Sequence, residues 1–202
     1  SRPDGARLGP PAFFDLLNGD KQSVALDLSA DSGRRQLRAL LARADIVVES
    51  ARPRGLEQMG IEAADIVREG AGRVWLSITG YGRAAPMRDW IAYGDDAGVA
   101  AGLSWLLGRD SGATVFCADA IGDPLAGLHA ALLAWAAWRA GGGFLLDVSL
   151  RRVLSWCIAA GNALPRDGER ELVAAVPCAR PATLRAATLG ADTARVLREF
   201  AA

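Results

Sequence analysis

Two aspartates, Asp119 and Asp123, stand directly ahead of an apolar run that extends to Trp138. Asp123 is followed by Pro124, and this pair predicts a helix start, because Asp is favoured at the N-cap and Pro at the first helical position. The positive end of the helix dipole favours the charged form of such a carboxylate. A charged carboxylate is chemically useful where a cleft opens above it. The alternative is that Asp123 only caps the helix.

The other reactive side chains are few. Cys117, Cys157 and Cys178 are odd in number and lack CxxC spacing, which argues against a disulfide scaffold or a zinc site. His129 is the one histidine, so a multi-histidine metal site is excluded. We expect His129 to be a packed or capped core residue, and we expect no metal.

The helix after Asp123 should be largely buried. Leu125, Leu128, Leu132 and Trp135 recur at helical spacing, with small residues between them. Three consecutive glycines at 141–143 end the helical pattern. We therefore expect a largely buried helix with the Asp123 carboxylate at its mouth.

Short apolar runs alternate with helical patterns along the chain, which predicts βαβ units and a parallel sheet. We expect strands 23–28, 45–49 and 73–79 to be parallel and adjacent. The third of these ends in Gly80-Tyr81-Gly82-Arg83, and ligands of open α/β sheets bind at the carboxyl ends of strands. A further strand is predicted at 144–148, and helices are predicted at 31–44, 61–69, 96–107, 123–139, 150–160 and 192–200.

Composition narrows the class of protein. The chain has 202 residues, 51% of them hydrophobic, and 23 basic against 23 acidic residues, so it has no basic field for a nucleic acid. No apolar run reaches the roughly 18 residues of a membrane span, and the N-terminus does not resemble a signal peptide, so a cytoplasmic protein is expected. Neither GxGxxG nor GxxxxGK[ST] occurs, which argues against an unrelated nucleotide-binding protein. We divide the chain into residues 1–165 and an extended arm with a terminal helix at 166–202.

Several segments resemble, in the same order, motifs of the class III coenzyme A transferases, the CaiB/BaiF-like family that includes 2-methylacyl-CoA racemase-like proteins. The resemblance covers about residues 13–160 and the last dozen residues. No single motif is decisive, but their shared order is specific. The segments are LNGDKQSVALDL (17–28), ADIVVESARPRGLEQMGI (44–61), RVWLSITGYG (73–82), DPLAGLHAALLA (123–134), FLLDVSL (144–150) and LGADTARVLREF (189–200).

The resemblance implies an α/β fold: a Rossmann-like open, mostly parallel sheet with helices on both faces. It corresponds to the family's large domain without its small domain and without its first strand–helix unit. It implies an intertwined homodimer that moves coenzyme A between an acyl-CoA and a free carboxylic acid. The uncovered apolar surface is expected around Trp135, Trp138 and Trp156, with the arm at 166–188 lying across the partner.

The resemblance also implies a role for Asp123. In the family, the matching aspartate attacks the acyl-CoA thioester, forms a mixed anhydride and then becomes an aspartyl-CoA thioester. Coenzyme A enters as acyl-CoA, a substrate. Its expected contacts are Lys21, Arg52, Gly80, Tyr81, Gly82 and Tyr93.

Two functions remain open from the sequence. One is an active transferase, and the other is a non-catalytic or partner-subunit member that dimerises or binds acyl-CoA. The racemase branch of the family has a histidine in a GHD element, whereas residues 92–96 read AYGDD here. His129 lies six residues beyond Asp123, on a different face of the helix, so these two side chains cannot pair.

Overall fold

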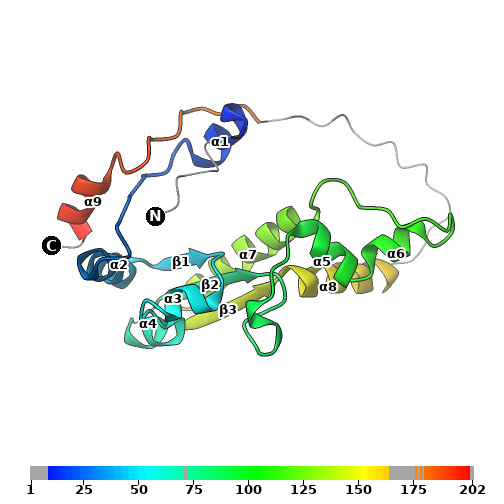
Figure 1. The fold of residues 1–202 in the computed structure, drawn as a ribbon, viewed down its shortest axis with the longest axis horizontal. Coiled ribbons are helices and arrows are strands. Elements are labelled where there is room, and N and C mark those ends of the chain that lie inside the picture. The colour runs from blue at the N-terminus through cyan, green and yellow to red at the C-terminus, as the bar shows by residue number, and fades with distance from the viewer. Residues whose placement is uncertain (1–8, 71, 164–175, 177, 179, 201–202) are drawn as a thin grey trace. The chain divides into compact units, whose positions relative to one another are not determined.

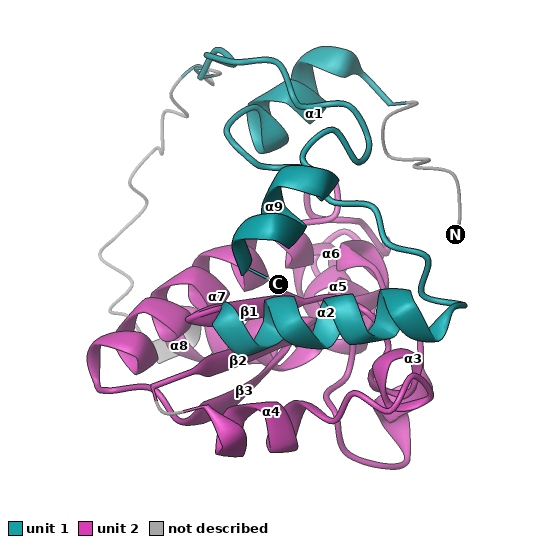
Figure 2. Cartoon of the chain, turned by 90° about the vertical axis from the view of Figure 1, so that its left-hand side faces the viewer, with its two compact units in different colours: residues 1–43, 168–202 teal, residues 44–167 magenta. Residues whose placement is uncertain are grey.

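The computed structural model describes residues 9–70, 72–163, 176, 178 and 180–200. The chain forms two compact units, one of residues 1–43 with 168–202 and one of residues 44–167 (Figure 2). This grouping differs from the expected division at residue 165, because the N-terminal segment is hydrogen-bonded to the C-terminal one. Of the expected arm at 166–188, residues 166–175, 177 and 179 lie outside the described residues, and its position across a partner stays a prediction.

The unit of residues 44–167 is built around a parallel sheet of three described strands (Figure 1). Their order is β1-β2-β3, with Val47 of β1 opposite Trp75 of β2, and Trp75 opposite Leu145 of β3. The predicted strands at 45–49, 73–79 and 144–148 are therefore confirmed. The elements are β1 (Ile46–Glu49), α3 (Pro53–Glu57), α4 (Ala63–Glu69), β2 (Val74–Thr79), the 3₁₀ turn η2 (Met87–Asp89), α5 (Gly94–Ala100), α6 (Leu103–Gly108), α7 (Gly122–Arg139), β3 (Phe144–Ser149) and α8 (Leu150–Ala163).

Helices cover both faces of the sheet. Four consecutive residues of β2, Val74 to Ser77, are at most 2% exposed. Successive side chains of a strand point to opposite faces, so both faces of β2 must be covered. Leu76 belongs to the core formed with α7 and α8, and α4 also contacts β2. The predicted α/β class with a parallel sheet is confirmed.

The buried face of α7 is not the predicted one. Ala126, Ala130 and Ala134 are buried against the sheet, whereas Leu128 and Leu132 are 69% and 62% exposed. Alanine allows the helix axis to approach the sheet closely, and the larger side chains then stand on the opposite side. The expectation that α7 is largely buried is therefore wrong for Leu128 and Leu132. The expected exposure of Trp135, Trp138 and Trp156 is confirmed.

One predicted helix is divided. Residues 96–107 were expected to form a single helix, but α5 ends before Gly102, whose φ is 84°, and α6 begins at Leu103. None of the helices within the described part of the chain combines the length and the apolarity that a bilayer crossing requires.

The unit of residues 1–43 and 168–202 contains α1 (Pro11–Asn18), α2 (Asp31–Arg43) and α9 (Thr193–Phe200). The predicted strand at 23–28 is wrong, because this segment has no strand partner among the described residues. Its backbone is used differently. The Ser23 amide donates to Asp192 Oδ2 at 2.9 Å, the Ala25 amide donates to Thr193 Oγ1 at 2.9 Å, and the Asp192 amide donates to the Ser23 carbonyl at 3.0 Å. The segment therefore anchors the start of α9.

Candidate active site

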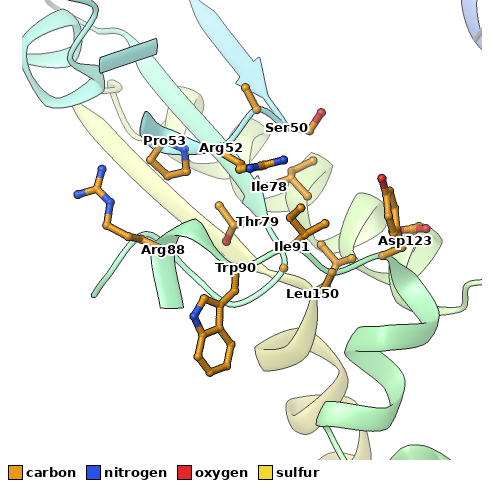
Figure 3. A pocket seen from close by; sticks show the side chains of 14 residues that line it. Ser50, Arg52, Pro53, Ile78, Thr79, Arg88, Trp90, Ile91, Asp123 and Leu150 are labelled. Carbon is orange, nitrogen blue, oxygen red and sulfur yellow. The ribbon is translucent and has the colours of Figure 1, made fainter. Parts of the chain in front are cut away.

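A cavity of about 400 Å³ opens where the three parallel strands end (Figure 3). Each strand sends the residues that follow it to the cavity: Ser50 to Pro53 after β1, Gly80 after β2 and Leu150 after β3. This is the position at which open α/β sheets bind ligands. The other lining residues are Ile78, Thr79, Arg88, Trp90, Ile91, Ala92, Tyr93 and Asp123.

Gly80 shapes one side of the cavity by allowing a close backbone contact. A Cβ atom at position 80 would lie 2.8 Å from Cβ of Ala92 and 3.0 Å from its nitrogen, so a side chain would push the 91–93 segment away. The Gly80 carbonyl accepts hydrogen bonds from Ser149 Oγ and from the Arg151 amide, both at 3.1 Å. The loop after β2 is thereby fixed to the start of α8.

Arg83 connects the ends of all three strands. Its Nη1 donates to Glu49 Oε1 of β1 at 2.9 Å and to Ser77 Oγ of β2 at 2.8 Å. Its backbone amide donates to Asp147 Oδ2 of β3 at 2.9 Å. Glu49 is 9% exposed, and the Ser77 hydroxyl donates to the same Oε1 at 2.5 Å. Charge-assisted hydrogen bonds of this kind are stronger than neutral ones, so they hold the strand ends that carry the cavity.

Asp123 lies in the first turn of α7 and is exposed to the cavity. The helix begins at Gly122, its N-cap position is Ile121, and no side chain caps it. Asp123 lies two residues past the N-cap position, so the interpretation of Asp123 as the N-cap is wrong. The Asp123 carboxylate does not accept the amide hydrogen bond that an N-cap side chain would accept. The Asp123 backbone amide donates to the Ala120 carbonyl at 2.9 Å.

Two arginines line the cavity, and they differ in their partners. Arg88 is paired with Glu57, and this hydrogen-bonded carboxylate raises the pKa of the Arg88 guanidinium. Arg52 forms no ion pair with a residue in the described ranges. In Figure 3 its guanidinium extends toward the side of the cavity where Asp123 stands, with Ile78 and Ile91 between them. A cation and a carboxylate therefore face one apolar-lined space.

Four of the predicted site residues come together in this cavity, namely Arg52, Gly80, Tyr93 and Asp123. Tyr81 does not line it but packs edge-on against Trp90, with ring centroids 5.6 Å apart. The Gly82 amide donates to Thr79 Oγ1 at 2.8 Å within the loop. Lys21 belongs to the other unit, where its Nζ lies 3.4 Å from Asn18 Oδ1. The binding roles of all these residues remain predictions.

Sequence reasoning missed the apolar wall of the site. Trp90 and Ile91 are both 57% exposed and lie in a segment that reads as a polar loop between residues 83 and 95. Two large apolar side chains inside a polar loop after a strand were the available signal. Within the described ranges, no group of three or more His, Cys, Asp or Glu side chains is placed to hold a metal ion.

The described geometry permits a carboxylate to meet a ligand at the strand ends. Asp123 is held on a helix, Arg52 offers a positive charge, and Ile78, Trp90, Ile91 and Leu150 give the space an apolar lining. Electrostatic interactions gain strength where water is excluded.

Known proteins with a similar sequence are named as CoA-transferases. The succinyl-CoA:(R)-benzylsuccinate CoA-transferase subunit BbsE of Thauera aromatica is 31% identical over 136 residues, which cover 65% of this chain and 33% of that protein. The succinyl-CoA:glutarate CoA-transferase of Mus musculus is 30% identical over 173 residues, covering 81% of this chain and 40% of that protein. The chain thus spans 33–40% of the length of these two curated relatives.

Solved structures share the fold. A CAIB/BAIF family protein from Brucella suis matches with a TM-score of 0.65 and 25% identity, covering 74% of this chain and 41% of that one. A hypothetical protein from Mycobacterium tuberculosis matches with a TM-score of 0.68 and 22% identity, covering 78% and 46%. The sequence model of CoA-transferase family III matches residues 2–169. This chain belongs to CoA-transferase family III.

Proposed function

We propose that this chain carries the nucleophile of a CoA-transferase that moves coenzyme A from an acyl-CoA to a free carboxylic acid. The observation that supports this most directly is the position of Asp123, exposed in the first turn of α7 beside a cavity at the carboxyl ends of parallel strands. Its carboxylate is not used to cap the helix, so it is available for chemistry.

The reaction divides into exchanges that conserve atoms and need no external acid or base. A carboxylate oxygen of Asp123 attacks the thioester carbonyl and the C–S bond breaks. The CoA thiolate departs, and Asp123 and the acyl group form a mixed anhydride. The thiolate attacks the Asp123 acyl carbon, which releases the donor acid and forms an aspartyl-CoA thioester. The acceptor carboxylate then attacks the aspartyl-CoA thioester, which releases the CoA thiolate and forms a second mixed anhydride. The thiolate attacks the acceptor acyl carbon of this anhydride, which gives the new acyl-CoA and frees the Asp123 carboxylate. Covalent catalysis replaces one difficult exchange with easier ones.

The first turn of α7 supports these steps electrostatically. Amides at a helix start lack intrahelical partners and favour negative charge. They favour the oxyanions that form when the thioester or the anhydride of Asp123 is attacked.

The cationic and backbone groups around the cavity are proposed to hold the acyl-CoA. Arg52 attracts its anionic groups, and the loop from Gly80 to Gly82 and Tyr93 border the thioester. Lys21 is proposed as a further contact for coenzyme A. Each of these roles rests on the cavity position or on the sequence resemblance.

We also infer that the protein acts as an intertwined homodimer. The exposed side of α7 carries Leu128, Leu132 and Trp135, which are 58–69% exposed. Trp156 of α8 is 62% exposed, and its ring lies 5.4 Å from that of His129 on α7. Contiguous apolar surfaces on soluble proteins usually mark interaction sites.

The test compares Asp123→Asn with the native chain. Both are mixed with succinyl-CoA and glutarate, the compounds that the names of relatives provide, and intact mass and product formation are measured. We expect a covalent adduct on the native chain only, and a turnover lowered more than about a thousandfold by Asn, which cannot form the anhydride. Because Asp123 makes no cap hydrogen bond, the substitution should change the free energy of unfolding by less than about 0.5 kcal/mol.

Asp119→Asn is the matched control, because Asp119 is also exposed but does not line the cavity. It should leave the adduct intact. A fully active Asp123→Asn variant would refute the covalent mechanism. A native chain that binds CoA without any adduct or turnover would favour the non-catalytic member of the family.

A further inference from the structure

The segment that leads into the Asp123 helix has an unusual backbone. Ala118 and Ala120 both have positive φ angles, 56° and 50°. For residues other than glycine this conformation is unfavourable, because Cβ approaches a carbonyl oxygen. Such a conformation persists only where neighbouring groups enforce it. The segment therefore needs a partner that holds it.

The Asp95 carboxylate on α5 is that partner. Its Oδ1 accepts a hydrogen bond from the Ala120 amide at 3.1 Å. The carbonyl of the same alanine accepts the Asp123 amide at 2.9 Å. Ala120 is thus bonded on one side to Asp95 and on the other side to the residue with the proposed nucleophile. Only Ile121 lies between Ala120 and Gly122, the residue at which α7 begins.

Close packing makes this connection stiff. A Cβ atom at Gly94 would lie 2.3 Å from the Ala120 carbonyl oxygen, and a Cβ atom at Gly122 would lie 2.8 Å from the Gly94 carbonyl oxygen. Distances under 3 Å leave no space for a side chain at either position. The starts of α5 and α7 are therefore in backbone contact, and a displacement of one is transmitted to the other.

The neighbouring carboxylate has a different task. Asp96 Oδ2 accepts the Tyr93 amide at 2.9 Å and so closes the first turn of α5 itself. Asp95 is directed out of its own helix to the segment before α7. The hydrogen bond from Ala120 is consequently a contact between elements and adds nothing to the capping of α5.

We propose that Asp95 is a positioning residue for Asp123, a role that rests on the proposed function. By accepting the Ala120 amide, Asp95 keeps the left-handed turn before α7 in place and thereby fixes where the Asp123 carboxylate enters the cavity. Asp95 does not line the cavity and does not touch the reacting atoms.

The test uses three variants chosen for their hydrogen-bonding ability. Asp95→Leu removes the acceptor, and Asp95→Asn keeps a side-chain oxygen that can accept the amide. Ala120→Gly, placed in the Asp95→Leu background, removes the cost of the positive φ. The rate of Asp123 acylation by succinyl-CoA is followed by intact mass, and exchange of the Ala120 and Ala130 amides is followed by hydrogen–deuterium exchange. Asp119→Asn is the control.

Asp95→Leu should lower the acylation rate about ten- to hundredfold, since small misplacements of a reacting group have effects of this size. The KM for acyl-CoA should stay within about twofold, because binding contacts are unchanged. Asp95→Asn should remain within about threefold of the native rate, and Ala120→Gly should restore most of the loss. Exchange should accelerate at Ala120 but not at Ala130, which lies inside α7.

An Asp95→Leu variant that is acylated at the native rate overturns the proposal, as does a loss that Asn and Gly fail to rescue. Fast exchange at Ala130 would show that Asp95→Leu unfolds α7. The Asp95→Asn variant then decides the question: a near-native acylation rate with native exchange at Ala120 supports the positioning role, and a low rate with native exchange at Ala120 contradicts it. If the native chain is never acylated, the proposed function fails and the positioning role falls with it. If the native chain is acylated and Asp95→Leu is acylated at the same rate, the positioning role alone is wrong.

Discussion

At the scale of single residues, the ion pair of Arg83 with Glu49 has the largest expected effect on stability. Their side chains are 18% and 7% exposed, and Glu49 Oε2 is buried without a hydrogen-bond partner among the described residues. Arg83→Met would leave this buried carboxylate without a cation, with the Ser77 hydroxyl as its remaining donor. Removing one partner of a buried pair costs about 3–5 kcal/mol, so we expect the free energy of unfolding in urea to fall by about 3 kcal/mol.

Arg109→Met provides the comparison, because Arg109 is 45% exposed and pairs with the 92% exposed Asp110. Surface pairs contribute about 0–1 kcal/mol, so this variant should unfold close to the native chain. Adding Glu49→Gln to Arg83→Met should recover part of the loss, since no buried charge then remains. Equal stability of the two arginine variants would show that Glu49 does not depend on Arg83.

Only part of this residue-level site was predictable. Asp123 and Gly80 follow sequence signals, namely a helix start and the end of an apolar run, and both line the cavity. Arg83 was visible only as part of a loop, because its role depends on Glu49 and Asp147, which lie 34 and 64 residues away. Trp90 was missed because it lies, with Ile91, in a loop that has no regular strand or helix pattern. Contacts over such separations leave no local pattern.

At the scale of elements, the attachment of α9 depends on pH through Asp192. Hydrogen bonding to the Ser23 amide and to the Arg195 guanidinium lowers the pKa of Asp192 below its usual value of 3.8. A carboxyl group with a lowered pKa stabilises the folded state above its unfolded pKa, and this contribution is lost as the pH falls through the folded value. We therefore expect α9 to loosen at pH values below about 3.8.

Asp192→Asn isolates this contribution. The variant should be less stable than the native chain at pH 7, and the difference between the two should shrink as the pH is lowered below 4. Hydrogen exchange of the Ser23 amide, measured from pH 7 down to pH 3, follows the contact directly. A difference that stays constant over this range would exclude Asp192 as the titrating group.

The elements also show why some predictions failed. The pattern of Leu128, Leu132 and Trp135 has the helical period of a buried face, but α7 buries the alanines between them. Periodicity identifies a helix and its apolar stripe, and in a helix that is apolar all round it cannot select the side that meets the sheet. Residues 23–28 have strand-like composition, yet their amides bond to Asp192 and Thr193, which are some 170 residues distant.

At the scale of the whole molecule, the exposed side of α7 predicts self-association. Leu132→Glu places a charge on this surface without opening the core, because Leu132 is 62% exposed. If α7 forms the proposed dimer interface, light scattering at micromolar concentration should give a dimer mass for the native chain and a monomer mass for the variant. Leu107→Glu, a change at a 49% exposed residue of α6, should leave the native mass unchanged.

A native chain that is monomeric at these concentrations would contradict the dimer. So would a dimer that persists after Leu132→Glu.

The alternation of strands and helices was sufficient to predict the parallel sheet of residues 44–167, because short connections permit few topologies. It was not sufficient to predict that residues 1–43 pack with the C-terminal segment, since that pairing depends on contacts between opposite ends of the chain.

Trp90 places a fluorescent side chain at the wall of the cavity. Its indole is 57% exposed at the cavity wall, whereas Trp75 in the sheet is 1% exposed. Indole emission depends on contact with water, and an adenine or acyl group that covers Trp90 alters that contact while the signal from Trp75 stays constant. Occupancy of the cavity should therefore change the Trp90 part of the intrinsic fluorescence, to which all six tryptophans contribute, and ligands can be ranked by titration without any label.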